Sequence, residues 1–317
     1  MDVLSDVIAA MRTGRPHSNL TRKRAPWATR FESAPGAGFH VVLQGSCWLL
    51  RSGAEPIPLG VGDVVFLRPR AAEHVMADSP RTAARLTRRE TLTAAAVGAA
   101  AEDAEVVMLC GAYLMDQSMP HPLLTELPEF IHLPARVGRH PNLRAATELL
   151  GAELERPGYG TDAIVPSLLD TLLLYLLRAW YDEQAHHGST GWAAALADSS
   201  ISVALRDIHD DPAHPWTVEQ LAGRARLSRA AFAKRFVQLV GRSPLAYVTW
   251  WRMTMAARAL RDTDEPLAAI ATRTGYTSEF AFAKAFKREF GSAPGGYRRT
   301  ARNPVPHTVS DSTAEQM

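Results

Sequence analysis

A stretch of sixteen residues that sets a lysine among phenylalanines occurs twice in this chain of 317 residues. It reads FAKRFVQLVGRSPLAY from Phe232 and FAKAFKREFGSAPGGY from Phe282, with seven identical positions. Lys234 and Lys284 stand at the same place in the two copies. A lysine ammonium donates hydrogen bonds to phosphate oxygens and to guanine edges, so the pair predicts contact with nucleic acid. A single such lysine is better explained by a solvated helix face, and it is the repeated constellation of residues that favours the functional interpretation.

In each copy, the residues around the lysine form one helix face that could also contact DNA bases and phosphates. If the phenylalanines face the core, the positions between them face outward. A glutamate can accept a hydrogen bond from a cytosine amino group, and small or apolar side chains can contact a thymine methyl group. Helix N-termini and nearby arginines suit phosphate oxygens, and Arg252 and Arg299 are candidates for that role. The predicted DNA-binding residues are Ser228, Arg229, Ala230, Ala233, Lys234, Ser278, Glu279, Phe280, Ala281, Lys284, Lys287 and Arg298.

Each copy needs a short helix, a tight turn and a longer helix to present that face. In the first copy Thr217 is the expected N-cap of the short helix, Ser228 that of the longer helix, and Gly241 its end. Between the copies, PLAYVTWWRMTMAARALRD predicts a helix of about eighteen residues, or about 27 Å in length. Such a rod can hold two recognition helices about 34 Å apart, so that both enter successive major grooves of B-DNA.

Residues 201–300 resemble the DNA-binding domain of the AraC/XylS family of bacterial transcription regulators, most specifically over IATRTGYTSEFAFAKAFKREFGSAPGGYR. The resemblance implies two helix-turn-helix motifs that bind double-stranded promoter DNA near RNA polymerase, most often as an activator. The alternative is an all-helical domain that binds protein. Two positions depart from the family pattern: Ala230 replaces a frequent large aromatic or polar residue, and Lys234 replaces a frequent arginine. The first recognition helix is therefore expected to read fewer bases.

The stretches FHVVLQGSCWLL and GVGDVVFLRPRAAEHVM resemble the two halves of a cupin barrel, as found before this DNA-binding domain in one subgroup of the family. A small barrel can enclose one small ligand, and His40, Trp48 and His74 are expected to line such an effector pocket. Cupin enzymes hold a metal with two or three histidines and a glutamate, but only His40 and His74 stand near those positions. We therefore expect a sensor without metal, cofactor or enzymatic activity. A metal-dependent cupin enzyme fused to a DNA-binding module is the alternative.

Cys47 and Cys110 are the two cysteines of the chain, too few for a disulfide framework. One interpretation of Cys110, which follows the apolar run VVML, is a buried and inert thiol. The other is an oxidant sensor, because some relatives in the cupin-bearing subgroup use cysteines to detect oxidants. A sensor that forms a disulfide within the chain would need Cys47 as its partner.

The change from short apolar runs to helical periodicity predicts an α+β fold, with strands first, a helical middle and a C-terminal all-α double helix-turn-helix domain. The resemblance implies that the N-terminal strands form a cupin-like β-barrel. The expected segments are a sensor domain with a first helix (1–140), a helical dimerisation region (141–192), the DNA-binding domain (193–300) and a disordered tail (301–317). Residues 101–200 carry 5 Lys and Arg against 14 Asp and Glu, whereas residues 216–300 carry 15 against 6. Only the C-terminal part is therefore expected to meet a polyanion. No signal peptide is recognised and the apolar run SLLDTLLLYLLRAW is too short to cross a bilayer, which predicts a cytoplasmic protein without membrane contact. The helical middle is expected to support a homodimer.

Overall fold

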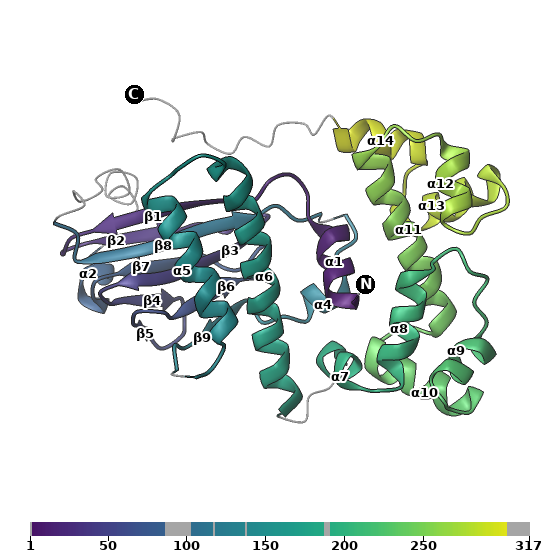
Figure 1. The fold of residues 1–317 in the computed structure, drawn as a ribbon, viewed down its shortest axis with the longest axis horizontal. Coiled ribbons are helices and arrows are strands. Elements are labelled where there is room, and N and C mark those ends of the chain that lie inside the picture. Colours follow the sequence, from purple (N-terminus) through teal and green to yellow (C-terminus); the bar gives the residue numbers. More distant parts are fainter. Residues whose placement is uncertain (1, 86–102, 117, 137, 187–190, 303–317) are drawn as a thin grey trace. The chain divides into compact units, whose positions relative to one another are not determined.

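The computed structural model describes residues 2–85, 103–116, 118–136, 138–186 and 191–302, which fold as two compact units (Figure 1). One unit consists of Arg12–Ser189 and contains strands β1 to β9. The other consists of Met1–Met11 together with Thr190–Met317, and its described residues form helices. The predicted α+β composition is thereby confirmed.

Two antiparallel sheets form the first unit. The five-stranded sheet has the order β1-β8-β3-β6-β9, and the four-stranded sheet has the order β2-β7-β4-β5. The strands are β1 His17–Lys23, β2 Ala28–Phe31, β3 Ala37–Gln44, β4 Cys47–Arg51, β5 Ile57–Leu59, β6 Val64–Leu67, β7 His74–Ala77, β8 Val106–Tyr113 and β9 Phe130–Leu133. This pair of sheets is the cupin-like architecture that the sequence predicted.

Alternate residues of the strands fill the space between the two sheets. Leu49 of β4 and Met108 of β8 belong to one buried core, although their strands lie in different sheets. Successive side chains of a strand point to opposite faces, so every second residue reaches this core. The register of β3 with β8 pairs His40 with Cys110, and β7 in the opposite sheet begins at His74. Three polar side chains from distant parts of the sequence are thus brought to one place.

Helices pack on the outer face of the five-stranded sheet. In Figure 1, α5 (Pro141–Glu155) and α6 (Thr161–His186) lie together in front of that sheet. The Tyr113 hydroxyl of β8 donates to the Leu169 carbonyl of α6 at 2.7 Å. Among the described residues of this unit, α2 (Pro80–Ala84) and α4 (Pro122–Thr125) are short helices. The helical middle therefore belongs to the sheet-containing unit.

Helix α6 is longer than the apolar run that the sequence suggested. Over Thr161–Gln184 it is long and apolar enough to cross a bilayer by length and composition alone, which corrects the expectation that this run is too short. Leu169, Leu172 and Leu176 of the same helix are buried. Because the core helix of a soluble protein passes the same test, one such helix is weak evidence for a membrane.

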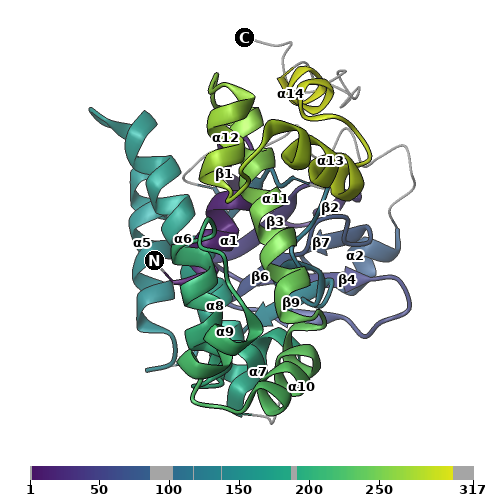
Figure 2. The ribbon, with the colours of Figure 1, turned by 90° about the vertical axis from the view of Figure 1, so that its right-hand side faces the viewer.

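Two helix-turn-helix motifs occupy the second unit, one near each end of the long helix α11 (Figure 2). The helices are α1 Val3–Met11, α7 Gly191–Ala197, α8 Ile201–Asp210, α9 Val218–Arg224, α10 Arg229–Val240, α11 Pro244–Asp262, α12 Leu267–Arg273, α13 Glu279–Phe290 and α14 Pro294–Arg302. The first motif is α9 and α10, and the second is α12 and α13. Residues 301 and 302 belong to α14 rather than to a tail, and residues 303–317 lie outside the described part.

The first helix packs with the helical unit, which corrects its expected place in the sensor domain. Its apolar residues, among them Val7 and Met11, are buried, and the helix contacts α8 and α11. Asp6 Oδ2 lies 3.4 Å from His209 Nδ1, and Arg261 Nη2 donates to the Ala10 carbonyl at 3.4 Å. The sequence shows that this helix is amphipathic, but an apolar stripe does not say which partner will cover it.

A guanidinium group at the middle of α11 ties the two motifs together. Arg252 Nε donates to the Pro212 carbonyl at 2.6 Å, and its Nη2 donates to the His214 carbonyl at 2.8 Å. These carbonyls lie in the loop that leads into α9. The same loop touches the turn of the second motif, because a Cβ on Gly275 would lie 2.7 Å from the Ala213 carbonyl oxygen and 2.9 Å from Arg252 Nη2. The spacing of the motifs therefore depends on this loop as well as on α11.

We expect Arg252→Ala to destabilise the helical unit. The exchange removes a charged donor from the carbonyls at 212–214, and a hydrogen bond to a charged group contributes about 1.5–3 kcal/mol. The free energy of unfolding, measured by urea titration of the full chain, should fall by ~2 kcal/mol or more. Arg299→Ala removes an exposed arginine and is the matched control. Equal stability of the two variants would show that Arg252 has no such role.

Candidate nucleic-acid interface and sensor cavity

The turn between the helices has the same hydrogen-bond pattern in both motifs. In each turn, one backbone amide donates to the carbonyl oxygen three residues back, and the next amide donates to the carbonyl oxygen five residues back. The four N···O distances are 2.8, 3.0, 3.0 and 3.1 Å. This Schellman pattern requires a positive φ, which is 55° at Arg226 and 80° at Gly275. Ser228 follows Arg226 by two positions, whereas Ser278 follows Gly275 by three. The second turn is therefore one residue longer than the first.

Serine caps begin both recognition helices, as the sequence predicted. Ser228 Oγ accepts from the Ala231 amide at 3.3 Å, and Ser278 Oγ accepts from the Ala281 amide at 3.1 Å. These hydroxyls are engaged by their own helices. A phosphate at either helix start would therefore meet the remaining amides of the first turn, which carry the positive end of the helix dipole.

Helix α10 buries one aromatic stripe and exposes a face of small and basic side chains. Phe232 and Phe236 are fully buried. Arg229 is exposed, and its Nε lies 2.9 Å from Glu219 Oε1 on α9. Ala233 is half-buried. The exposed residues on the outward face are Arg229, Ala230, Lys234 and Val237. Because Arg229 already has an ion-pair partner, Lys234 is the stronger candidate for a phosphate or base contact from this helix.

The exposed face of helix α13 carries acidic, aromatic and basic side chains, a wider range than that of α10. Phe282 and Phe286 are buried in a core with residues of α11 and α12. The outward-facing exposed residues are Glu279, Phe280, Ala281, Lys284 and Lys287. The Phe280 side chain is 80% exposed, although burying a phenylalanine contributes about 1.5–3 kcal/mol. A large aromatic ring left in water next to two lysines indicates a surface that meets a partner.

The predicted phosphate-binding arginines differ in their surroundings. Arg252 is committed to the carbonyls at 212–214, and burial lowers its pKa from the ordinary value. This corrects its assignment as a phosphate contact, because its guanidinium already supports the fold. Arg298 is half-buried, and its Nη2 donates to the Glu265 carbonyl before α12. Arg299 is exposed.

A cavity of about 330 Å³ lies in the sheet-containing unit, next to the paired strands β3 and β8. His40, His74 and Cys110 all line it, and the other lining residues with polar side chains are His17, Ser18, Asn19, Glu32 and Arg68. The volume lies within the range of small-molecule sites. Two of the three predicted pocket residues are thereby brought together, and Cys110 joins them.

Trp48 does not line this cavity, which corrects its expected role. Cys47 and Leu49 on either side of it point into the core between the sheets. Since side chains alternate along a strand, Trp48 must point to the opposite face of β4, where it is half-buried. The alternation in CWLL shows from the sequence that Trp48 and Cys47 point to opposite faces of the strand. Which of the two faces borders the core could not be read from the sequence.

His40 stands between the other two polar groups. Its Nδ1 lies 3.1 Å from Cys110 Sγ, and its Nε2 lies 2.9 Å from His74 Nε2. One tautomer satisfies both bonds: the Cys110 thiol donates to His40 Nδ1, and His40 Nε2–H donates to His74. Phe31 stacks on the His74 ring with 5.0 Å between the ring centroids.

Burial keeps these three groups uncharged near neutral pH. Desolvation lowers the pKa of His40 to about 3, with a further contribution from His74, and lowers the pKa of His74 to about 4. It raises the pKa of Cys110 to about 12, against the opposing effects of Thr21 and Lys23. The cavity wall therefore offers neutral hydrogen-bonding groups here.

The described residues contain no group of three or more His, Cys, Asp or Glu placed to hold a metal ion. Cys110 and His74 contact opposite nitrogens of the His40 ring. A single ion could not take both positions unless the rings moved. The residues present thus do not fit the metal centre of a cupin enzyme.

Cys47 is buried in the same core as Cys110 and is a free thiol. Its Sγ lies 3.8 Å from Met108 Sδ, and burial raises its pKa to about 12. Both thiols are therefore protonated at neutral pH, and the thiolate is the form that reacts with oxidants.

Comparison with known proteins bears on both units. The family model described as Cupin matches residues 2–182, and the one described as Helix-turn-helix domain matches residues 221–300. A Streptomyces lividans protein described as an AraC-like transcription regulator is 35% identical over 314 residues, which cover 96% of this chain and 100% of that protein. The chain belongs to the AraC family of transcription regulators. The Cupin match begins at residue 2, although α1 packs with the helical unit.

Other relatives of this AraC-family chain are also regulators. The HTH-type transcriptional regulator MtrA of Neisseria gonorrhoeae is 30% identical, over 86% of this chain and 90% of MtrA. Among solved structures, the DNA-binding domain of AdpA in complex with a target DNA is 33% identical, covers 35% of this chain and 98% of that domain, and has a TM-score of 0.32. The family matches confirm a DNA-binding transcription regulator with a cupin-type ligand-sensing domain.

Sequence reasoning missed part of the cavity of this AraC-family regulator. Strand β1, HSNLTRK, has almost no apolar alternation, and yet it supplies Asn19 to the cavity wall and the buried Lys23. Desolvation lowers the pKa of Lys23, and the neighbouring Cys110 acts in the opposite direction. A polar edge strand carries no periodic signal, so only its pairing with β8 shows that it borders the cavity.

The neutral histidines make the sensor unit acid-sensitive. Their folded-state pKa values of about 3 and 4 lie below the ordinary value of 6.5, so below pH 6.5 the unfolded chain takes up protons that the folded chain does not. Stability is complete above pH 6.5 and falls as the pH drops towards 4, by at most ~1.4 kcal/mol per pH unit for each histidine.

Urea unfolding at pH 7.5 and pH 5 checks this expectation. Wild type should lose more stability between the two pH values than His40→Asn, because the variant has lost one of the two titrating rings. An equal loss in both proteins would contradict the assignment of neutral His40.

Proposed function

We propose that this regulator binds double-stranded promoter DNA by inserting α10 and α13 into successive major grooves. The observation that carries the proposal is the pair of serine-capped helices with exposed, basic outer faces near the two ends of α11. At 19 residues α11 is about 28 Å long, comparable to one turn of B-DNA. The excess of basic residues in the C-terminal part favours a polyanionic partner.

The two helices make unequal contributions to base recognition in this proposal. On α13, Glu279 accepts from a cytosine amino group, Phe280 packs on a thymine methyl group, and Lys284 donates to a guanine edge or a phosphate. On α10 the small Ala230 and Ala233 leave Lys234 as the principal polar contact. We infer that α13 determines most of the sequence preference and that α10 mainly binds the backbone.

The cavity beside His40, His74 and Cys110 is the proposed effector site. Its size suits a small molecule, and its neutral imidazole and thiol groups suit an uncharged polar portion of that molecule. Effector binding then alters DNA binding, and the regulator acts in the bacterial cytoplasm as an activator that contacts RNA polymerase. Such a protein needs no enzymatic activity and no cofactor.

A homodimer through α5 and α6 completes the proposal. Leu149 of α5, Tyr159 between the helices and Ile164 of α6 are exposed apolar side chains of one helical hairpin. Burying them against a second copy would remove apolar surface from water, which stabilises association by about 25 cal/mol per Å² before the costs of binding.

We expect Lys284→Ala to weaken specific DNA binding more than it weakens folding. A good base contact is worth about 1–3 kcal/mol, so affinity for the cognate duplex should fall by about tenfold or more. The duplex comes from genomic fragments selected with the wild-type protein, and affinity is measured by fluorescence anisotropy at physiological salt. Arg206→Ala, an exposed arginine on α8, is the control. Unchanged affinity of Lys284→Ala would refute the role of this residue.

The alternative regulator is a redox switch at Cys110, with Cys47 as its resolving partner. Since both thiols are buried and protonated, we expect brief peroxide treatment to change DNA affinity by less than about twofold in wild type. Cys110→Ser should behave identically with and without oxidant. An oxidant effect that a reductant reverses, and that Cys110→Ser abolishes, would establish the switch and overturn the small-molecule proposal.

A further inference from the structure

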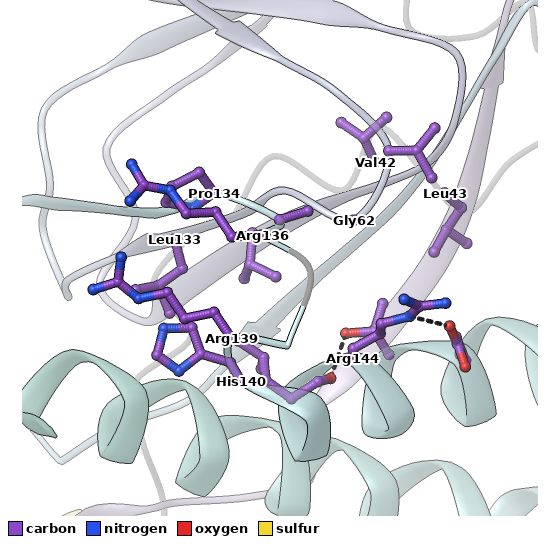
Figure 3. Close-up of a pocket in the computed structure, with 15 residues that line it drawn as sticks. Val42, Leu43, Gly62, Leu133, Pro134, Arg136, Arg139, His140 and Arg144 are labelled. Atoms are coloured by element: carbon purple, nitrogen blue, oxygen red, sulfur yellow. Dashed lines mark hydrogen bonds and ion pairs between the residues drawn. The ribbon is translucent and has the colours of Figure 1, made fainter. Parts of the chain in front are cut away.

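A second cavity, of about 430 Å³, lies outside the barrel core beside helix α5 (Figure 3). It is bordered by the end of β3, the turn before β6, the end of β9 and the first turns of α5. It shares no lining residue with the cavity at His40. A ligand here would therefore occupy a different site from the effector proposed above.

The floor of this outer cavity is apolar. Val42, Val64, Leu133 and Leu143 line it and are nearly inaccessible to solvent. The exposed Val61 lies at its edge. Such a floor favours an apolar body, which would gain about 25 cal/mol for each Å² of apolar surface removed from water.

The rim is strongly basic. Arg136, Arg139 and Arg144 line the cavity against one carboxylate, Glu148. In Figure 3 the guanidinium groups of Arg136 and Arg139 extend to the same side of the view. A concave site with charges of one sign concentrates ligands of the opposite charge.

The three arginines are not equally available to a ligand. Arg144 Nε lies 2.7 Å from Glu148 Oε1, and Arg139 Nη2 lies 3.0 Å from Glu183 Oε1. Arg136 is exposed and makes no ion pair with the described residues. Its guanidinium is therefore the group that a bound anion can reach without displacing a carboxylate.

The start of α5 adds to the positive field. Its N-cap is His140, with φ 56° and ψ 50° and no hydrogen bond from its side chain to the helix. Proline at the next position has no amide proton, and the following amides of this 15-residue helix carry the positive end of its dipole. His140 Nε2 lies 3.0 Å from Glu183 Oε1 and so does not cap the helix.

We propose that the outer cavity binds an organic carboxylate with a compact apolar body, with the apolar part on Val64 and Leu143 and the carboxylate at Arg136. The fork of N–H groups on a guanidinium matches a carboxylate in two parallel hydrogen bonds. An inorganic anion would leave the apolar floor uncovered, and a neutral molecule would leave the arginine unpaired. Neither an inorganic anion nor a neutral molecule would contact both the apolar floor and the guanidinium of Arg136 favourably.

Titration calorimetry on the full-length chain tests this proposal with naphthoate as the probe and naphthamide as its neutral counterpart. Naphthoate should bind, and naphthamide should bind at least about tenfold more weakly, because it cannot form the charged pair. Inorganic phosphate should not compete with naphthoate at equal concentration.

Two variants locate the binding. Arg136→Ala should weaken naphthoate binding by about tenfold or more, and Val61→Trp should abolish it by filling the edge of the cavity. Arg156→Ala, an exposed arginine at the other end of α5, should bind as wild type does. No measurable naphthoate binding would overturn the proposal, as would equal binding of naphthoate and naphthamide or wild-type affinity in Arg136→Ala and Val61→Trp. None of these results bears on DNA binding by α10 and α13.

Discussion

The hydrogen bonds from Arg252 to the loop at 212–214 are the constraint on which the DNA-binding unit depends. A single helix-turn-helix motif can bind one major groove of DNA by itself. Two motifs in one chain can bind successive major grooves only if their separation is fixed. Helix α11 fixes the distance between them. Arg252 adds the angular constraint, because it holds the loop before α9 against the turn at Gly275. The half-buried guanidinium is held by carbonyl oxygens, which is how a buried charge is tolerated without a carboxylate partner.

Burial acts in the opposite way in the sheet-containing unit, where it removes charge. His40, His74 and Cys110 form a chain of short contacts, and desolvation favours the uncharged form of each group. The outer cavity beside α5 keeps its arginines exposed and therefore charged. One unit thus offers two chemically different environments, a neutral cluster of imidazole and thiol groups at one cavity and a basic rim around the other.

The sequence predicted the DNA-binding unit far better than the sensor. Repetition, serine caps and Gly and Pro stops are local signals, and they correctly indicated α10, α11 and α13. Apart from the length of α6, the errors concern contacts between distant segments: the partner of α1, the direction of Trp48 and the burial of Arg252. An amphipathic helix, an alternating strand and an arginine look the same in sequence whichever neighbour they meet. Strand β1 was missed because its polar residues carry no periodic signal, although its pairing with β8 brings Asn19 to the cavity.

In the proposed mode of DNA binding, the unequal roles of α10 and α13 follow from their rigid connection. When two reading helices are held as one body, the one with more specific contacts determines the position of both on the DNA. Helix α13 carries the acidic, aromatic and basic side chains needed for that role, so α10 needs only to be compatible with the resulting position. Small side chains such as Ala230 and Ala233 meet that requirement, since they let the helix backbone approach the duplex closely. The small outward side chains of α10 are therefore compatible with specific DNA binding in the proposed mode, provided that α11 and the Arg252 loop keep the two helices in fixed register.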